Sequence, residues 1–214
     1  MAQVARKGRS REEILRAAAR GIAKHGFHGM SMRELARETG KGLATFYNHF
    51  SSKEELLFEL QRQAFTTLVQ GATESLSGVG DPEERLRSFI DNHVHYFIGN
   101  PEVMQVLVRE AAALPPPWRK VVRELKESYF EIGREVVTAV HAPARRGSNE
   151  QTKQDHEVEL ERSTYNLFGM LNWVYGWYDP SRHGDPRDVA QTIHRMTLHG
   201  LAEDSPTRSS SSRP

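Results

Sequence analysis

Apolar residues recur along this chain with the three-to-four-residue spacing of an α-helix, almost from end to end. The strict alternation of apolar and polar residues that is typical of half-buried strands is not found. Proline and glycine divide the pattern into segments of helical length. It therefore predicts an all-α protein of about nine helices, near residues 11–25, 32–38, 43–49, from 53 to beyond 69, 82–99, 102–113, 117–140, 155–178 and 186–202.

Several of these predicted helices have recognisable starts and ends. A capping box pairs a serine, which caps an early backbone N–H, with a glutamate three residues later that bonds back to the serine. Glycine is common where a helix terminates. The predicted capping boxes are Ser10–Glu13, Ser31–Glu34 and Ser52–Glu55, and the predicted terminators are Gly26, Gly29 and Gly40.

Two short predicted helices, 32–38 and 43–49, are joined by the four residues 39–42, which is typical of a helix-turn-helix. The small residues Gly42 and Ala44 would let the second helix approach base edges closely. A helix this short is unstable alone, so packing must hold it. We expect Phe46 and Phe50 to face inward, and the polar side chains offered to DNA to be Thr45, Tyr47, Asn48 and His49.

The charge of the chain is unevenly distributed, although its net value is only +1. Residues 1–50 contain ten Lys/Arg and four Asp/Glu, a net charge of +6, so the remainder carries −5. A basic N-terminal part on an acidic body favours a polyanionic partner for the basic part alone. A basic N-terminal tail without a binding role is the alternative interpretation.

Two stretches of the chain resemble the helix-turn-helix of the TetR/AcrR family. They are residues 26–36 (GFHGMSMRELA) and residues 40–50 (GKGLATFYNHF), the latter followed by Ser52-Lys53-Glu54-Glu55-Leu56. The resemblance implies a homodimer that binds a palindromic DNA operator as a ligand-responsive transcriptional repressor. It also implies an N-terminal three-helix helix-turn-helix head and a C-terminal helical bundle for ligand binding and dimerisation.

The resemblance also implies which residues of the head contact DNA. Ser31 is in addition the N-cap of its helix, and Arg33 is equally compatible with a solvated surface charge. Tyr47 is better explained by DNA contact than by the core, because Phe46 and Phe50 already supply apolar anchors. The expected DNA-binding residues are Ser31, Arg33, Lys41, Ala44, Thr45, Tyr47, His49 and Lys53.

The segment 165–178 is apolar nearly all round when placed on a helix, so we expect it to be buried on several sides. Gly169 and Gly176 lie within this segment, and glycine within a helix costs stability. Close approach of the following predicted helix, 186–202, would offset that cost. Two such helices from each protomer would form a four-helix dimer interface, as the family resemblance also implies. The expected interface residues are Tyr165, Gly169, Gly176, Ile193 and Met196.

The pattern Asn172-Trp173-x-x-x-Trp177-Tyr178-x-Pro180 resembles a subgroup of the family that senses fatty-acyl or related CoA thioesters. An apolar pocket suits an acyl chain, and Arg109, Arg119 or Arg123 would then pair with CoA phosphates. Simple core packing and solvated surface charge are the alternative interpretations of these residues. The expected lining residues are Phe65, Leu68, Phe89, His93, Phe97, Met104, Val108, Asn172 and Trp173.

The pattern and the resemblance together imply a basic flexible arm (1–9), a helix-turn-helix domain (10–56), a ligand-binding and dimerisation domain (57–204) and a disordered tail (205–214). The absence of cysteine excludes thiolate chemistry and fits a reducing cytoplasm. His93 and His95 are two apart, which places them on different helix faces, so no metal site is expected. No membrane span, signal peptide, cofactor or catalytic motif is expected.

Several functional alternatives remain at this level. The regulator could respond to a hydrophobic molecule other than an acyl-CoA, or act as an activator or with a co-repressor. An architectural DNA-binding protein without a ligand is a further possibility, and a helical enzyme is disfavoured by the missing catalytic motifs.

Overall fold

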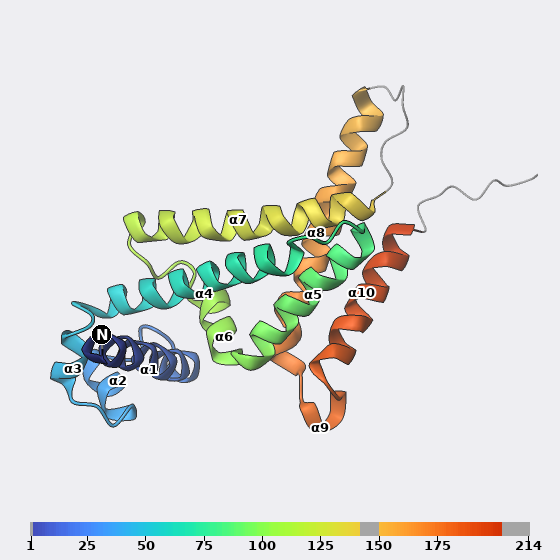
Figure 1. The fold of residues 1–214 in the computed structure, drawn as a ribbon. Helices are drawn as coiled ribbons and strands as arrows, with labels where there is room; N and C mark the ends of the chain where they lie inside the picture. The colour runs from blue at the N-terminus through green and yellow to red at the C-terminus, as the bar shows by residue number, and fades with distance from the viewer. Residues whose placement is uncertain (1, 142–149, 203–214) are drawn as a thin grey trace, which may run out of the picture. The chain divides into compact units, whose positions relative to one another are not determined.

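A computed structural model describes the backbone of residues 2–141 and 150–202, and the side chains of residues 11–141 and 150–199. All regular elements of the described part are α-helices, which confirms the all-α prediction (Figure 1). They are α1 (Ala2–His25), α2 (Met32–Glu38), α3 (Leu43–Tyr47), α4 (Lys53–Leu76), α5 (Pro82–Gly99), α6 (Pro101–Arg109), α7 (Pro116–Val140), α8 (Glu150–Trp177), α9 (Pro180–His183) and α10 (Pro186–Ala202).

The helices form two compact units, each with its own core. The first unit contains α1, α2, α3, α6 and parts of α4, α5 and α7, from residues 2–71 and 96–130. The second contains α8, α9, α10 and the remaining parts of α4, α5 and α7, from residues 72–95 and 131–202. No helix in the described ranges has the length and hydropathy needed to cross a membrane.

The first three helices of the first unit bury one apolar face each, at the positions that the sequence pattern predicts. Burial of these side chains is the main favourable contribution to the association of such short helices. Gly29 permits the tight turn after α1, because a Cβ there would lie 2.3 Å from the carbonyl oxygen of His25. The buried side chains are Ile14, Leu15, Ala18 and Ile22 of α1, Met32, Leu35 and Ala36 of α2, and Phe46 of α3, with Phe50 just after it.

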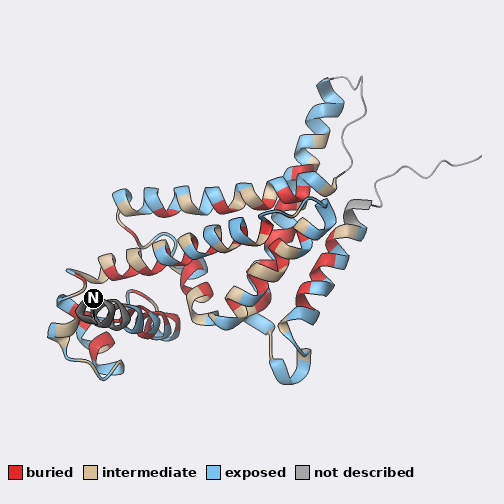
Figure 2. Cartoon of the chain, in the orientation of Figure 1, coloured by how far each residue is buried: buried red, intermediate tan, exposed pale blue. Residues whose placement is uncertain are grey.

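The second unit is packed around aromatic side chains of α5 and α8. Phe89 and Phe168 meet edge to face with ring centroids 6.0 Å apart. Gly133 of α7 makes room for this pair, since a Cβ there would lie 2.7 Å from the Phe168 ring. The first turns of α8 are pale blue in Figure 2 and the later turns are partly red, because burial begins at Leu160.

Several predicted boundaries are wrong. Helix α1 begins at Ala2 rather than Arg11, so residues 2–9 have a helical backbone instead of that of a flexible arm. The chain is already helical before Ser10, so no helix begins there; the Ser10 side chain lies outside the described residues, as does the predicted tail. Helix α3 ends at Tyr47, α6 ends at Arg109, and α8 begins at Glu150, five residues early.

The prediction of about nine helices is confirmed, and the described residues add one short helix that was not predicted, the four-residue α9. Its N-cap is Asp179, whose carboxylate accepts the Ser181 N–H at 2.8 Å. A single turn contains too few residues to show a hydrophobic period, so the pattern could not reveal it.

Candidate nucleic-acid interface

The turn between α2 and α3 is held by a compact set of hydrogen bonds. The Thr39 hydroxyl donates to the Ala36 carbonyl at 2.9 Å, and the Lys41 N–H donates to the same carbonyl at 3.2 Å. Gly40 has a φ of 64°, a left-handed conformation that glycine adopts without strain. The predicted turn 39–42 is therefore confirmed, and it fixes α3 relative to α2.

Helix α3 presents a small exposed face on the opposite side from its buried anchor. Phe46 is fully buried, whereas Ala44, Tyr47 and Asn48 are exposed, with 53% of the Tyr47 side chain accessible. Residues three and four apart lie on one side of a helix, so these three side chains share one face. Asn48 completes this surface, although it was expected only as a general hydrogen-bonding group; its position four residues after Ala44 is the signal that identifies it.

Thr45 and His49 lie beside this face and are half-buried. The His49 ring lies 6.3 Å from the ring of Phe50, between centroids. Gly42 precedes the helix with an extended backbone and no capping side chain. The N-terminal turn of α3 therefore offers backbone N–H groups beside a side chain as small as Ala44.

The start of α2 is the predicted capping box, and the structure confirms it. The Glu34 N–H donates to the Ser31 hydroxyl at 3.3 Å, and the Ser31 N–H donates to the Glu34 carboxylate at 2.7 Å. The hydrogen bond from the Ser31 backbone, followed by that from its hydroxyl, lowers the pKa of Glu34 below its usual value. Ser31 remains exposed beside Arg33, which is also exposed.

Two lysines expected at DNA have protein partners in this structure. The Lys41 ammonium lies 2.9 Å from a carboxylate oxygen of Glu13 on α1. The Lys53 ammonium donates to the Phe27 carbonyl at 2.9 Å and lies 4.3 Å from the centroid of the Phe27 ring. Lys53 is therefore directed at the turn after α1, which the sequence could not show because Phe27 is 26 residues away.

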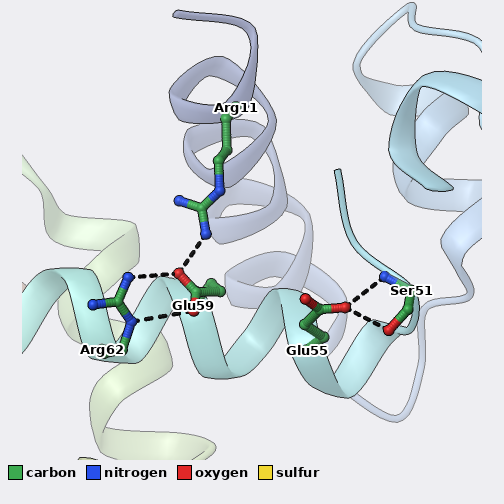
Figure 3. A network of polar contacts seen from close by, with 5 residues as sticks. All are labelled: Arg11, Ser51, Glu55, Glu59 and Arg62. Carbon is green, nitrogen blue, oxygen red and sulfur yellow. Dashed lines mark hydrogen bonds and ion pairs between the residues drawn. The ribbon is translucent and has the colours of Figure 1, made fainter. Parts of the chain in front are cut away.

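Helix α1 is fastened to α4 by a charged network (Figure 3). Arg11 and Arg62 both point at the Glu59 carboxylate, with Arg62 bonding it at 2.8 and 3.1 Å. Partial burial raises the pKa of Glu59, but the hydrogen bonds from Arg62 and Arg11 outweigh it and hold the pKa below its ordinary value. Arg11 also lies 5.2 Å from the centroid of the Phe50 ring. The network thus links α1 to α4 beside the anchor of α3.

Exposed cations extend along the first two helices. Arg16, Arg20 and Lys24 are spaced four apart on α1, and Arg33 and Arg37 are exposed on α2. Arg16 lies 3.8 Å from Glu12, a loose pair with both side chains more than half exposed, and such pairs contribute little. The head therefore carries positive charge at its surface, which is the requirement for attracting DNA phosphates.

The residues expected to line an effector pocket divide between the two units. In the first unit Phe65, Leu68, Phe97 and Met104 are buried, but Val108 is 49% exposed. In the second, Phe89 and His93 are buried, and burial lowers the pKa of His93 to about 3, so its imidazole is neutral.

Trp173 is 62% exposed, which makes it a surface residue of the protomer, like Val108. Leu171 and Val174 occupy the inner face of α8, so Trp173 falls on the outer face, and Asn172 lies at the edge between the two.

Of the arginines considered for CoA phosphates, Arg119 donates instead to the Leu114 carbonyl at 2.7 Å, and Arg123 lies 3.5 Å from Glu127.

A cavity of about 280 Å³ lies within the first unit, between α1, α4, the end of α5 and α6. None of the expected pocket residues lines it. Its walls mix polar and apolar groups: Glu12, Leu15, Arg16, Leu60, Gln63, Ala64, Thr67, Tyr96, Asn100 and Val103.

The residues expected at a dimer interface are mostly exposed. Tyr165 and Met196 are 59% and 60% exposed, and Gly169 and Gly176 lie on the same outer side of α8 as Trp173. Ile193 is the exception, since it is buried within the second unit. The expected close approach of α10 to Gly169 is also wrong, because a Cβ at Gly169 would meet nothing within 4 Å.

A two-helix motif whose second helix exposes one face, on a head with a surplus of surface cations, defines the class of helix-turn-helix DNA-binding proteins. Comparison with known families agrees: residues 14–60 match the bacterial regulatory proteins of the tetR family, and residues 79–201 match the tetracyclin repressor-like C-terminal domain. The chain belongs to the TetR family of transcriptional regulators.

Two curated relatives share part of the chain. The transcriptional repressor NicS of Pseudomonas putida is 26% identical over 102 residues, which are 48% of each chain. The transcriptional repressor AcnR of Corynebacterium efficiens is 37% identical over 81 residues, 36% of this chain and 43% of that one. This chain therefore spans about half the length of the curated relatives that it matches.

Solved structures match over most of the chain. The regulator PfmR of Thermus thermophilus has a TM-score of 0.71 and 28% identity, covering 88% of this chain and 98% of that one. AibR, solved with isovaleryl coenzyme A and operator DNA, has a TM-score of 0.70 and 23% identity, covering 87% and 97%. The latter likeness establishes the shared fold.

Proposed function

We propose that the protein is a dimeric transcriptional repressor that binds a palindromic operator and is released from it by a hydrophobic effector. The observation that carries the proposal is the exposed face of α3 on a head of net positive charge. Two heads about one helical turn of DNA apart, roughly 34–36 Å, would enter successive major grooves. Such a protein acts where the DNA is, in the cytoplasm.

Ala44 and Tyr47, with Asn48, would contact bases, because they form the exposed face of the recognition helix. Thr45 and His49 would contact bases or phosphates from the edge of that face. Ser31 and Arg33 at the start of α2 would contact phosphates, as would Lys41 and Lys53 after exchanging their protein partners for DNA. Phosphate contacts position the head, and base contacts choose the sequence.

A second copy of the chain would cover the exposed outer face of α8 and α10. Large apolar side chains are exposed on both helices, Tyr165, Trp173 and Trp177 on α8 and Met196 on α10, and exposed apolar surface is typical of an interaction site. Gly169 would let the partner helix approach closely, since nothing within the protomer occupies that space. A two-fold dimer would bring the same face of two copies together.

We propose a fatty-acyl-CoA or related CoA thioester as the effector class. AibR, which shares the fold, was solved with isovaleryl coenzyme A, and the Asn172–Pro180 pattern resembles an acyl-CoA-sensing subgroup. Another hydrophobic small molecule is the alternative. An activator, or a repressor that needs a co-ligand, would show the opposite sign of ligand effect on DNA affinity.

A mobility-shift titration on DNA from upstream of the protein's own gene tests the proposal, with and without an acyl-CoA series. We expect the protein to shift the DNA, and acyl-CoAs of one chain-length class to dissociate the complex. Arg33→Ala should weaken binding and reduce its salt dependence, whereas Arg123→Ala, which removes the same charge from α7, should change neither. Binding that no acyl-CoA alters would reject the effector class and keep the DNA-binding proposal, and strengthening by acyl-CoA would indicate a co-repressor.

A further inference from the structure

Helix α1 ends where its backbone hydrogen bonding is interrupted, and α6 supplies both missing partners. In a continuing helix the Phe27 N–H would donate to the Ala23 carbonyl, four residues earlier. Instead the Phe27 N–H donates to the Glu110 carboxylate at 3.0 Å. The Ala23 carbonyl accepts from the Gln105 side-chain amide at 3.0 Å. A donor and an acceptor from α6 and its C-cap thus replace one helical hydrogen bond.

The other side of the same peptide segment is held from α4. The Phe27 carbonyl accepts from the Lys53 ammonium at 2.9 Å, and the Phe27 ring is 2% exposed beneath that ammonium. Glu110 is itself fixed to α4, because its backbone carbonyl accepts from the side-chain amide of the buried Gln61 at 3.1 Å. Both polar groups of the Phe27 backbone are therefore satisfied by side chains remote in sequence.

The segment held in this way leads directly into the DNA-reading part of the head. Only residues 26–31 separate α1 from α2, and Ser31 at their end is the N-cap of α2. The turn between them is tight, because the backbone at Gly29 passes so close to His25 that a Cβ there would lie 2.3 Å from the His25 carbonyl oxygen. A shift at Phe27 must therefore be passed on to α2, and through the rigid turn 39–42 to α3.

We propose that Glu110 and Gln105 are positioning residues for DNA binding: they hold the backbone at the end of α1, at Ala23 and Phe27, and so set the placement of the helix-turn-helix, without touching DNA. This inference rests on the proposed DNA-binding function. A buried N–H without an acceptor is costly. When the Glu110 carboxylate is lost, we therefore expect the turn to rearrange so that the Phe27 N–H finds another acceptor. The link also makes α6, a helix of the body, a determinant of the geometry of the head.

The test compares Glu110→Ala, Glu110→Gln and Gln105→Met with the wild-type dimer. Glutamine retains an oxygen that accepts from the Phe27 N–H, whereas alanine does not; methionine keeps the length of Gln105 but removes its donor. Glu124→Ala, an exposed acid on α7 in the same unit, is the matched control. Amide hydrogen exchange at Phe27 and operator affinity at several salt concentrations are measured for each variant.

We expect Glu110→Ala to speed exchange at Phe27 at least tenfold and to weaken operator binding about tenfold. The salt dependence should stay unchanged, because no phosphate contact is lost. Glu110→Gln should remain within about threefold of wild type in both readouts, Gln105→Met should weaken binding, and Glu124→Ala should alter nothing.

Faster exchange at Phe27 with unchanged DNA affinity would overturn the positioning role, since the bond would then be purely structural. Unchanged exchange in Glu110→Ala would overturn the hydrogen-bond assignment itself. If Glu110→Ala does not fold, Gln105→Met decides by operator affinity alone, and unchanged affinity in that variant would overturn the positioning role. Wild-type protein that binds no DNA would instead refute the proposed function, and the exchange at Phe27 would still report on the bond independently of DNA.

Discussion

Phe46 is the side chain whose removal should most directly separate the recognition helix from the head. It is 0% exposed, and the helix that carries it, α3, has only 5 residues. A helix of that length has no stability of its own, so α3 depends on Phe46 and the neighbouring Phe50. Truncating a buried phenylalanine to alanine costs about 3–5 kcal/mol, including the cavity left behind.

A loss of this size is large compared with the ~5–15 kcal/mol that stabilises a typical domain. Even about 3 kcal/mol changes an equilibrium constant more than 100-fold. Phe46→Ala should therefore lower the midpoint of urea unfolding by about 1–5 M, given a usual dependence of stability on urea of about 1–3 kcal/mol per M. Operator binding should be lost as well, because α3 would no longer be held against α2.

The measurement is urea unfolding followed by circular dichroism, together with operator binding below the unfolding transition. Tyr47→Ala is the control on the same helix, because it removes an exposed ring and should change stability by less than about 0.5 kcal/mol. It should nevertheless weaken operator binding. A cost below about 1 kcal/mol for Phe46→Ala would refute the reasoning, since α3 would then be held by something other than this anchor.

Three further outcomes follow from the structure. Ser31→Ala should destabilise the protein by about 1 kcal/mol in thermal unfolding, because it removes the cap of α2, and Ser31→Asp should restore most of the loss. The lowered pKa of Glu59 contributes stability that is present above the unfolded value of 4.5 and lost as pH falls through the folded pKa, so Glu59→Gln should flatten the acid limb of the stability profile. Gly169→Arg should shift the sedimentation of the protein from dimer to monomer without unfolding it, and an unchanged dimer would remove the proposed interface.

Local signals in the sequence were sufficient for much of the head. The Ser31–Glu34 capping box is a short-range motif, and the structure has both of its hydrogen bonds. The spacing of Phe46 and Phe50 predicted their burial, because a helix has only one face toward its neighbours. A helix start that depends on a longer stretch of chain was missed. The apparent capping box at Ser10 predicted the start of α1 there, but the helix already begins at Ala2.

The body shows why helical spacing alone cannot assign a face when both faces are apolar. Around 165–178 either side could have been buried, and the structure buries Leu171 and Val174 while exposing Trp173. Ile193 was expected at the surface between protomers but is needed in the core of its own unit. Choosing between such faces requires knowledge of the neighbouring helices.

Gly26 predicted the end of α1, but the side-chain contacts with the backbone around that end had no signal in the sequence. Glu110 and Phe27 are separated by 83 residues, and Gln105 and Ala23 by 82. A polar residue near the end of α6 is ordinary in itself, so nothing marked these two as partners of a distant backbone. The same is true of Lys53, which was expected at DNA phosphates and is directed at Phe27.

A footprint on DNA from upstream of the protein's own gene tests the central claim most directly. The account predicts two protected patches with two-fold symmetry, their centres about one helical turn apart. Tyr47→Ala should lose both patches together while remaining dimeric. Wild-type protein that protects no sequence at modest salt, or that protects every sequence equally, would contradict the assignment of α3 as a sequence-reading helix.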